Sequence, residues 1–153
     1  MRLVNRTFNE LQTGDVAELR GMKLFFGEKA ECFHCHSSFN FNDQIVHAGS
    51  RIVETPFHNT GLYNLDGRGA YPAISPGLIE QPGLAADMGR FRVPSLRNVA
   101  MTAPYFHDGS APTLERAIDV MFQYQLGRIP SDEDRRLIML FLKTLTAEKA
   151  GQP

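Results

Sequence analysis

The stretch between Asn40 and Pro112 is the feature that most limits what this chain can fold into. It is dense in Gly, Pro and Asn, and its apolar residues follow neither a sustained helical period nor a sustained strand period. A span that long without regular structure is uncommon in a compact domain unless it serves a site or wraps a ligand. The sequence therefore predicts loops that bury themselves against something other than secondary structure.

Amphipathic helices are predicted on both sides of this stretch. The first runs from Asp15 to Lys29, with Asp15 as its N-cap. The second begins after Thr113, a suitable N-cap, and the third after Ser131, which has capping-box spacing to Asp134. Their apolar stripes are Leu19, Met22, Phe25 and Phe26 in the first, Leu114, Ala117, Ile118 and Met121 in the second, and Ile138, Phe141, Leu142 and Leu145 in the third.

The two cysteines of the chain, Cys32 and Cys35, are directly followed by His36. A Cys-x-x-Cys pair occurs in redox disulfides, in zinc sites and at haem attachment points. A structural zinc site normally repeats a paired spacing, and no second pair follows, although the chain has five histidines. A redox dithiol favours a βαβ pattern, which this sequence lacks. His36 completes Cys-x-x-Cys-His, the signature of covalent haem c.

Haem also accounts for the irregular middle of the chain. Each cysteine sulfur adds to one vinyl group, and the spacing of Cys32 and Cys35 suits vinyls on neighbouring pyrroles, with His36 as the proximal iron ligand. The apolar faces of the ring give loops a surface to bury against. We therefore expect an all-α, cytochrome c-like haem domain over residues 15–147, with three main helices and long irregular loops wrapping the haem. Residues 1–14 are interpreted as an N-terminal extension or inter-domain linker, and 148–153 as a tail.

The net charge and the hydropathy of the sequence limit the partners and the cellular location that we expect for this protein. The net charge of -1 leaves no basic excess to neutralise phosphates, so no nucleic-acid partner is expected. No apolar run approaches the roughly 20 residues that a membrane-spanning helix needs. Because c-type haem is normally attached outside the cytoplasm, we expect a periplasmic protein. No secretion signal is visible, so Met1 is interpreted as the start of a mature or truncated chain.

The ligand on the other side of the iron decides the chemistry. A Met gives a six-coordinate electron carrier, whereas an open position admits peroxide. Of the six methionines, Met1 is terminal and Met22 and Met139 belong to or flank apolar helix faces, which leaves Met88, Met101 and Met121. Met121 also completes an apolar stripe, so a packing role competes with a ligand role. His58 and His47 are rival ligands.

The run from Phe91 to Ser110, FRVPSLRNVAMTAPYFHDGS, strongly resembles the bacterial di-haem cytochrome c peroxidases and the related MauG-type enzymes. Together with Thr113-Leu114-Glu115 and the haem motif, the resemblance covers most of the chain from Gly14 to Thr146. The stretch from Pro56 to Asn64 looks most like the MauG-type branch, which modifies tryptophan in partner proteins and includes the di-haem enzymes of methanobactin gene clusters.

The resemblance implies that this chain matches the C-terminal half of such enzymes, which holds the electron-transferring haem. In the peroxidases the distal ligand is a Met eight residues after the Thr of Thr-Leu-Glu, which corresponds here to Met121. The MauG-type enzymes place a Tyr there, so Met121 favours the peroxidase branch. Tyr124, one turn further on, would need a shifted helix to take that place.

The resemblance also implies roles for the loop residues. Carbonyl oxygens of Thr102 and Pro104 would contribute to a calcium ion between two haems, because calcium prefers oxygen ligands. Arg97 is expected to hold a haem propionate with two hydrogen bonds, with an ordinary loop salt bridge as the alternative. His107 is expected to fix a loop or face another domain, and the adjacent Asp108-Gly109 predicts a turn.

The implied function is the electron-transfer half of a di-haem cytochrome c peroxidase-like oxidoreductase. It would take electrons from a small cytochrome c or copper protein and pass them to a peroxidatic haem for hydrogen peroxide reduction. That haem and the Trp between the haems belong to a second haem domain, in the same full-length chain or separate, and this chain has no Trp. A homodimer is an expected assembly.

No catalytic residue is assigned in this chain. Its nearest acid–base candidates, Glu54, Asp66 and Asp108, have no counterpart in that role in the family. The alternatives are a MauG-type di-haem enzyme that oxidises a partner protein and a stand-alone monohaem electron carrier.

Overall fold

The computed structural model describes residues 16–42, 57–62, 76–78 and 84–147. Its helices and strands are, in chain order, α2 (Ala17–Phe25), η2 (Cys32–His34), β1 (Phe57–His58), η5 (Ala85–Asp87), β2 (Phe91–Arg92), η6 (Val99–Met101), α3 (Leu114–Leu126) and α4 (Asp132–Thr144). The η elements are short 3-10 turns. Every helix in the described ranges is too short or too polar to cross a membrane.

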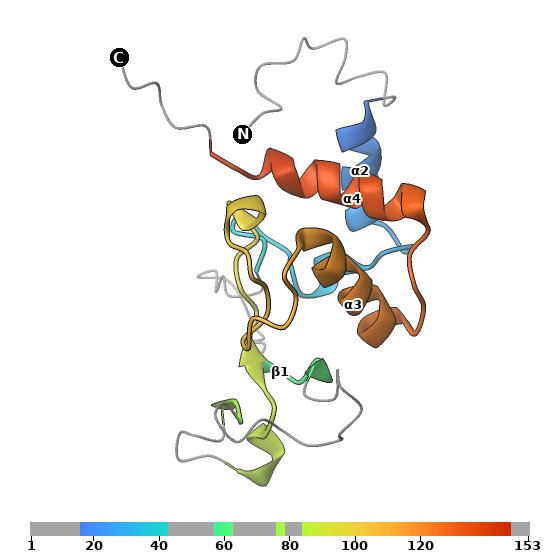
Figure 1. Ribbon diagram of the computed structural model, residues 1–153. Helices are drawn as coiled ribbons and strands as arrows, with labels where there is room; N and C mark the ends of the chain where they lie inside the picture. Colours follow the sequence, from blue (N-terminus) through green and yellow to red (C-terminus); the bar gives the residue numbers. More distant parts are fainter. Residues whose placement is uncertain (1–15, 43–56, 63–75, 79–83, 148–153) are drawn as a thin grey trace, which may run out of the picture.

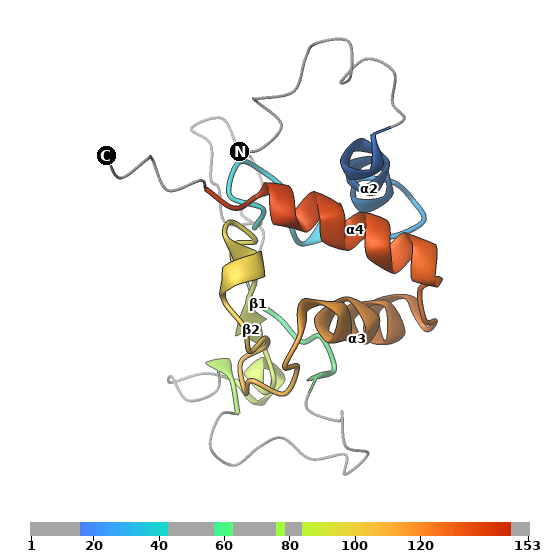
Figure 2. The ribbon, with the colours of Figure 1, turned by 45° about the horizontal axis from the view of Figure 1, so that its top comes forward.

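The fold is mostly helical, as expected, but the described part is not purely α. Strands β1 and β2 form a small antiparallel sheet in which Phe57 is opposite Arg92 and His58 is opposite Phe91. This sheet was not predicted, because two residues per strand are too few to show an alternating pattern. It joins two segments of the long irregular stretch, to one side of the three α-helices (Figure 2).

Helix α4 lies between α2 and α3, and crosses α2 closely (Figures 1 and 2). The close approach occurs at Gly21, where an added Cβ would lie 2.0 Å from the Leu137 carbonyl oxygen. No side chain fits there without a shift of one helix. The first helix therefore packs against a helix near the C-terminus, and a glycine permits the contact.

The first helix is shorter than predicted. It ends at Phe25 rather than continuing to Lys29, because the Gly27 N–H turns back to the Leu24 carbonyl in a tighter bond that closes the helix. Phe26 is consequently 45% exposed and does not belong to the buried stripe. Asp15, the predicted N-cap, lies outside the described residues, and Val16 occupies the cap position without a side-chain bond.

The other two helices begin at the predicted caps. Thr113 Oγ1 accepts a hydrogen bond from the Arg116 N–H at 3.2 Å, and Ser131 Oγ accepts one from the Asp134 N–H at 3.1 Å. Helix α3 ends at Gly127, whose φ of 65° is the left-handed conformation typical of a helix C-terminus.

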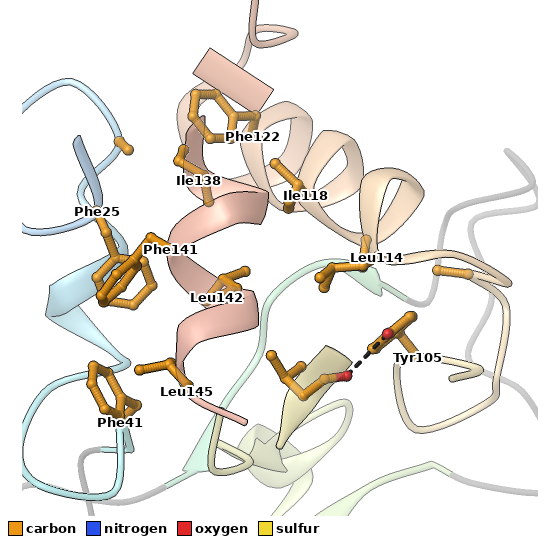
Figure 3. Packing of buried hydrophobic residues seen from close by; sticks show 14 residues of the cluster. Phe25, Phe41, Tyr105, Leu114, Ile118, Phe122, Ile138, Phe141, Leu142 and Leu145 are labelled. Atoms are coloured by element: carbon orange, nitrogen blue, oxygen red, sulfur yellow. Dashed lines mark hydrogen bonds between the residues drawn. The ribbon is translucent and has the colours of Figure 1, made fainter. Parts of the chain in front are cut away.

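The core is built around α4 (Figure 3). The rings of Phe25 and Phe41 lie 5.2 and 6.1 Å from the ring of Phe141, centroid to centroid. All predicted apolar positions of α4 are buried, and α3 adds its own buried residues: Leu114, Ala117, Ile118, Val120 and Phe122. Tyr105 packs at one side of this core, and its hydroxyl donates a hydrogen bond to the Val99 carbonyl at 3.0 Å.

Polar contacts tie the turn after α2 to the α3–α4 connection. Lys29 Nζ lies 2.7 Å from a carboxylate oxygen of Asp134, which is only 6% exposed. Burial alone would raise the pKa of Asp134, but hydrogen bonds from Lys29 and Ser131 outweigh it and hold that pKa below its usual value. Arg128 also donates from its guanidinium to the Lys29 carbonyl. The residues just before Cys32 are thereby fixed to the far end of α3.

The Gly21→Ala variant tests the α2–α4 contact. Alanine favours helix by about 1 kcal/mol over glycine, so an exposed site would gain stability. At this crossing we expect instead a loss of about 1–3 kcal/mol, because the helices must separate. The measurement is the free energy of unfolding from a denaturant titration followed by circular dichroism. Lys23→Ala, on the exposed side of the same helix, is the control and should stay within about 0.5 kcal/mol.

Candidate functional site

The Cys-x-x-Cys-His motif forms a short turn directly after α2. The 3-10 helix Cys32–His34 is closed by the N–H of His36, which donates to the Cys32 carbonyl at 2.9 Å. Glu31 enters this turn in a left-handed conformation with φ 52°. Cys32, Cys35 and His36 are all half-buried, so the motif lies at the edge of the core with part of each side chain accessible.

Cys32 and Cys35 are not joined in a disulfide. Cys32 packs against the core, and its Sγ contacts the Ala30 carbonyl at 3.5 Å. Burial, followed by a smaller contribution from nearby Cys35, raises the pKa of Cys32 to about 12. A reactive redox dithiol needs a lowered thiol pKa, so this environment does not favour the dithiol interpretation. The zinc interpretation gains no support either, because the described ranges contain no group of three or more suitable ligand side chains.

The ring of His36 is held in one tautomer. Its Nδ1 lies 3.0 Å from the Phe41 carbonyl oxygen, and a carbonyl oxygen can only accept a hydrogen bond. Nδ1 is therefore protonated, and Nε2 is the basic nitrogen of the ring. Metal-binding histidines commonly donate their other ring N–H to a backbone carbonyl in this way. The pair of unbridged thiols and this tautomer together fit a covalently attached haem with iron on Nε2.

The loop that follows the motif carries the Phe41 carbonyl and is bound by two residues from a distant segment. Ser95 Oγ donates to the Asn40 carbonyl at 2.7 Å. The Arg97 guanidinium donates from Nε at 3.0 Å, and from Nη2, to the Phe39 carbonyl. Arg97 also lies over the Phe39 ring, 4.0 Å from its centroid. The sequence pattern does not predict either contact, because the two partners are more than fifty residues apart in the chain.

The predicted role of Arg97 stays a prediction. The structure places its guanidinium on a backbone carbonyl, and no carboxylate in the described part of the chain pairs with it. The alternative of an ordinary loop salt bridge therefore finds no partner among those residues.

Met121 differs from the other methionines in its surroundings. It is half-buried on α3, but it is not part of the core cluster that includes its stripe neighbours Ala117 and Ile118. Met22 and Met139 pack against that cluster. The remaining rivals are more open to solvent, with Met88 37% exposed and Met101 75% exposed. Met1 and His47 lie outside the described residues.

The other aromatic candidates have defined places. His58 is half-buried in β1 and pairs through its backbone with Phe91. Tyr124, on α3, lies close to Gly61. His107 stacks on the Phe91 ring, with centroids 3.9 Å apart. Its Nε2 is buried and has no hydrogen-bond partner among the described residues. Stacking of this kind agrees with the expected loop-fixing role.

Thr102 and Pro104 lie on the exposed loop after η6. Thr102 Oγ1 donates to the Val99 carbonyl at 3.0 Å, and Tyr105 forms a β-bridge with Ala111. The Ala103–Pro104 peptide is cis. Calcium binding by the two carbonyl groups stays a prediction.

The turn predicted at Asp108-Gly109 is present. Gly109 has φ 69°, and Asp108 Oδ1 accepts from the Ser110 N–H at 3.0 Å. Burial opposes ionisation of Asp108, but hydrogen bonds from Ser110, with a smaller electrostatic contribution from the neighbouring His107, outweigh it and lower the pKa of Asp108. Asp108 is thus an anionic turn residue rather than a group poised to give up a proton near neutral pH. Glu54 and Asp66, the other acid–base candidates, lie outside the described residues.

Comparisons with known proteins agree with the motif. No family model matches the chain. It is 34% identical to the cytochrome c551 peroxidase of Nitrosomonas europaea, over 86% of this chain and 35% of that protein. It is 33% identical to the methylamine utilization protein MauG of Methylorubrum extorquens, again over 86% of this chain and 35% of that protein. The names of the peroxidase relatives imply c-type haem.

A solved structure gives the same result at the level of the fold. A MauG-like protein associated with microbial copper homeostasis is 46% identical and superposes with a TM-score of 0.73, covering 87% of this chain and 47% of that one. The chain spans about a third of the length of the two curated relatives named above. The similarity nevertheless extends over nearly all of the chain and includes the haem motif, and the chain therefore belongs to the family of bacterial cytochrome c peroxidases and MauG proteins.

Proposed function

We propose that this chain is the electron-transfer haem domain of a periplasmic, di-haem cytochrome c peroxidase-like oxidoreductase. The observation that carries the proposal is the His36 ring, whose Nδ1 donates to the Phe41 carbonyl beside two half-buried cysteines that are not joined in a disulfide. Cys32 and Cys35 would attach haem c through thioether bonds, and His36 and Met121 would be the axial ligands. A haem bound there supplies a one-electron redox centre whose potential depends on those ligands.

The residues of the chain would have two roles. Some would hold the haem in place, and Met121 would limit the access of small molecules to it. The two thiols prevent dissociation, and the Phe41 carbonyl keeps the His36 ring in its orientation. Met121 would exclude water and peroxide from the other side. Electrons would arrive from a small cytochrome c or copper protein and leave to a second, peroxidatic haem domain, with calcium held by the Thr102 and Pro104 carbonyl groups near the junction.

A MauG-type enzyme that oxidises a partner protein is the second candidate. The similarity to the MauG-like solved structure, 46% identical over 87% of this chain, favours it. The residue at position 121 favours the peroxidase, because the resemblance predicts a Tyr there in MauG-type enzymes. Met121 and Tyr124 are three positions apart on α3, which is nearly one helical turn. The two side chains therefore lie at different places along the helix, and only one of them can be at the position of the ligand. Identification of the axial ligand therefore separates the two candidates.

Covalent haem is the first prediction. Protein made with a haem c maturation system should remain coloured after acid-acetone extraction and gain the mass of one haem, measured by mass spectrometry. Cys32→Ala combined with Cys35→Ala should lose that mass, because no sulfur remains to bond the vinyl groups. Ser37→Ala, beside the motif, is the control and should retain it. Wild-type protein that holds zinc and no porphyrin would contradict the proposal.

The axial ligand is tested by replacing Met121. Wild-type ferric protein should show the weak near-infrared absorption band of a thioether on haem iron. Met121→Ala should abolish the band, and Met121→His should keep six-coordinate iron with a lower reduction potential, because imidazole is the stronger donor. Met101→Ala, at an exposed methionine, should leave both band and potential unchanged. A band that survives Met121→Ala would assign the ligand to another residue.

The isolated chain should be a slow peroxidase. Cleavage of the O–O bond needs an open iron position and a group that moves a proton between the two oxygens. With His36 and Met121 on the iron, peroxide cannot bind. We expect steady-state oxidation of reduced cytochrome c by hydrogen peroxide to be slow, and to increase when the N-terminal haem domain of a di-haem relative is added with calcium. Rapid turnover by this chain alone would show that its iron is open.

A further inference from the structure

Three consecutive backbone carbonyl groups follow the haem motif, and each has a side-chain donor. The Phe39 carbonyl accepts from the Arg97 guanidinium, and the Asn40 carbonyl accepts from the Ser95 hydroxyl. The third, the Phe41 carbonyl, accepts from Nδ1 of His36. The two donors from residues 95 and 97 therefore bind the same short strip of backbone that orients the proposed iron ligand.

One local bond, from the Phe41 N–H to the Ser38 carbonyl at 3.1 Å, closes this strip as a turn, but the backbone conformation it requires is not a locally preferred one. Ser38 and Phe41 have φ values of 65° and 52°, in the left-handed region that non-glycine residues rarely adopt. A residue in this conformation is strained and persists only where surrounding contacts impose it. The strip needs restraint from outside.

Burial supplies that restraint at one end only. The Phe41 ring is 9% exposed and packs against Phe25 and Phe141. Phe39 is 74% exposed and Asn40 is also exposed, so the hydrophobic core does not hold the other end. The bonds from Ser95 and Arg97, with the guanidinium lying over the Phe39 ring, are the contacts that fix it.

The two residues act as one unit. The Ser95 hydroxyl oxygen accepts from the Arg97 backbone N–H at 3.2 Å while its hydrogen goes to the Asn40 carbonyl. Arg97 directs two donors of its planar fork to a single oxygen, which a lysine cannot reproduce. Ser95 and Arg97 thus define the position of the strip relative to residues 93–98.

We propose that Ser95 and Arg97 are positioning residues for His36, which act through the Phe39 and Asn40 carbonyl groups to keep the Phe41 carbonyl on Nδ1. The inference rests on the proposed role of His36 as iron ligand. A histidine whose Nδ1–H is donated firmly is a more electron-rich ligand, which favours ferric iron. Release of the strip should therefore weaken the Nδ1 bond and raise the reduction potential.

The test uses Ser95→Ala and Arg97→Lys in the haem-loaded chain. Neither substitution changes the net charge. Ser95→Ala also leaves Arg97 and its predicted propionate contact in place, so the potential of that variant responds to the strip alone. In protein with ¹⁵N-labelled histidine, we expect the Nδ1 proton of His36 to exchange with water about fivefold faster in each variant, the effect of losing about 1 kcal/mol of hydrogen bonding. The reduction potential should shift upward. Arg92→Lys, on the exposed side of β2, is the matched control and should leave both quantities at wild-type values.

The outcomes separate this inference from the proposed function. Wild-type protein without the mass of haem would overturn both. Wild-type protein with haem, together with unchanged proton exchange and potential in a variant, would overturn the positioning role of that residue alone. If Arg97→Lys fails to fold, Ser95→Ala, which removes a single oxygen atom, decides the matter by the same two measurements.

Discussion

Phe41 connects the core of this protein to its candidate site. Its ring packs against Phe25 from α2 and Phe141 from α4, while its carbonyl accepts the Nδ1 proton of His36. Its backbone is left-handed, a conformation maintained by the contacts around it. The orientation of the proposed iron ligand therefore depends on how α2 and α4 pack, and that packing depends in turn on the absence of a side chain at Gly21.

The sequence predicted well those features that depend on neighbouring residues. Thr113 and Ser131 cap α3 and α4 because a cap needs only a hydroxyl two or three residues before the donor. The Cys-x-x-Cys-His motif is equally local, and its role as the haem attachment site stays a prediction. The end of α2 was missed because Gly27 closes it through the backbone, and Phe26 was consequently placed on the wrong face.

Long-range features could not be predicted in the same way. The bond from Ser95 to the Asn40 carbonyl joins residues on two irregular segments, and nothing in the spacing of either segment indicates which atoms meet. The sheet of Phe57–His58 and Phe91–Arg92 is similar, because only the fold brings the two segments together. Met121 shows the opposite case. Its apolar spacing is also that of a core residue, yet it is half-buried and not a member of the core cluster.

The contacts among Lys29, Arg128 and Asp134 bear on how fast a haem held at the proposed site would exchange electrons. They tie the turn that leads into Cys32 to the connection between α3 and α4, so that both proposed ligand-bearing segments belong to one braced frame. If haem is attached as proposed, such a frame would hold the residues around it in nearly the same positions in both redox states. The rearrangement of the protein that accompanies each electron would then be small, and electron exchange would stay fast even when donor and acceptor differ only slightly in potential.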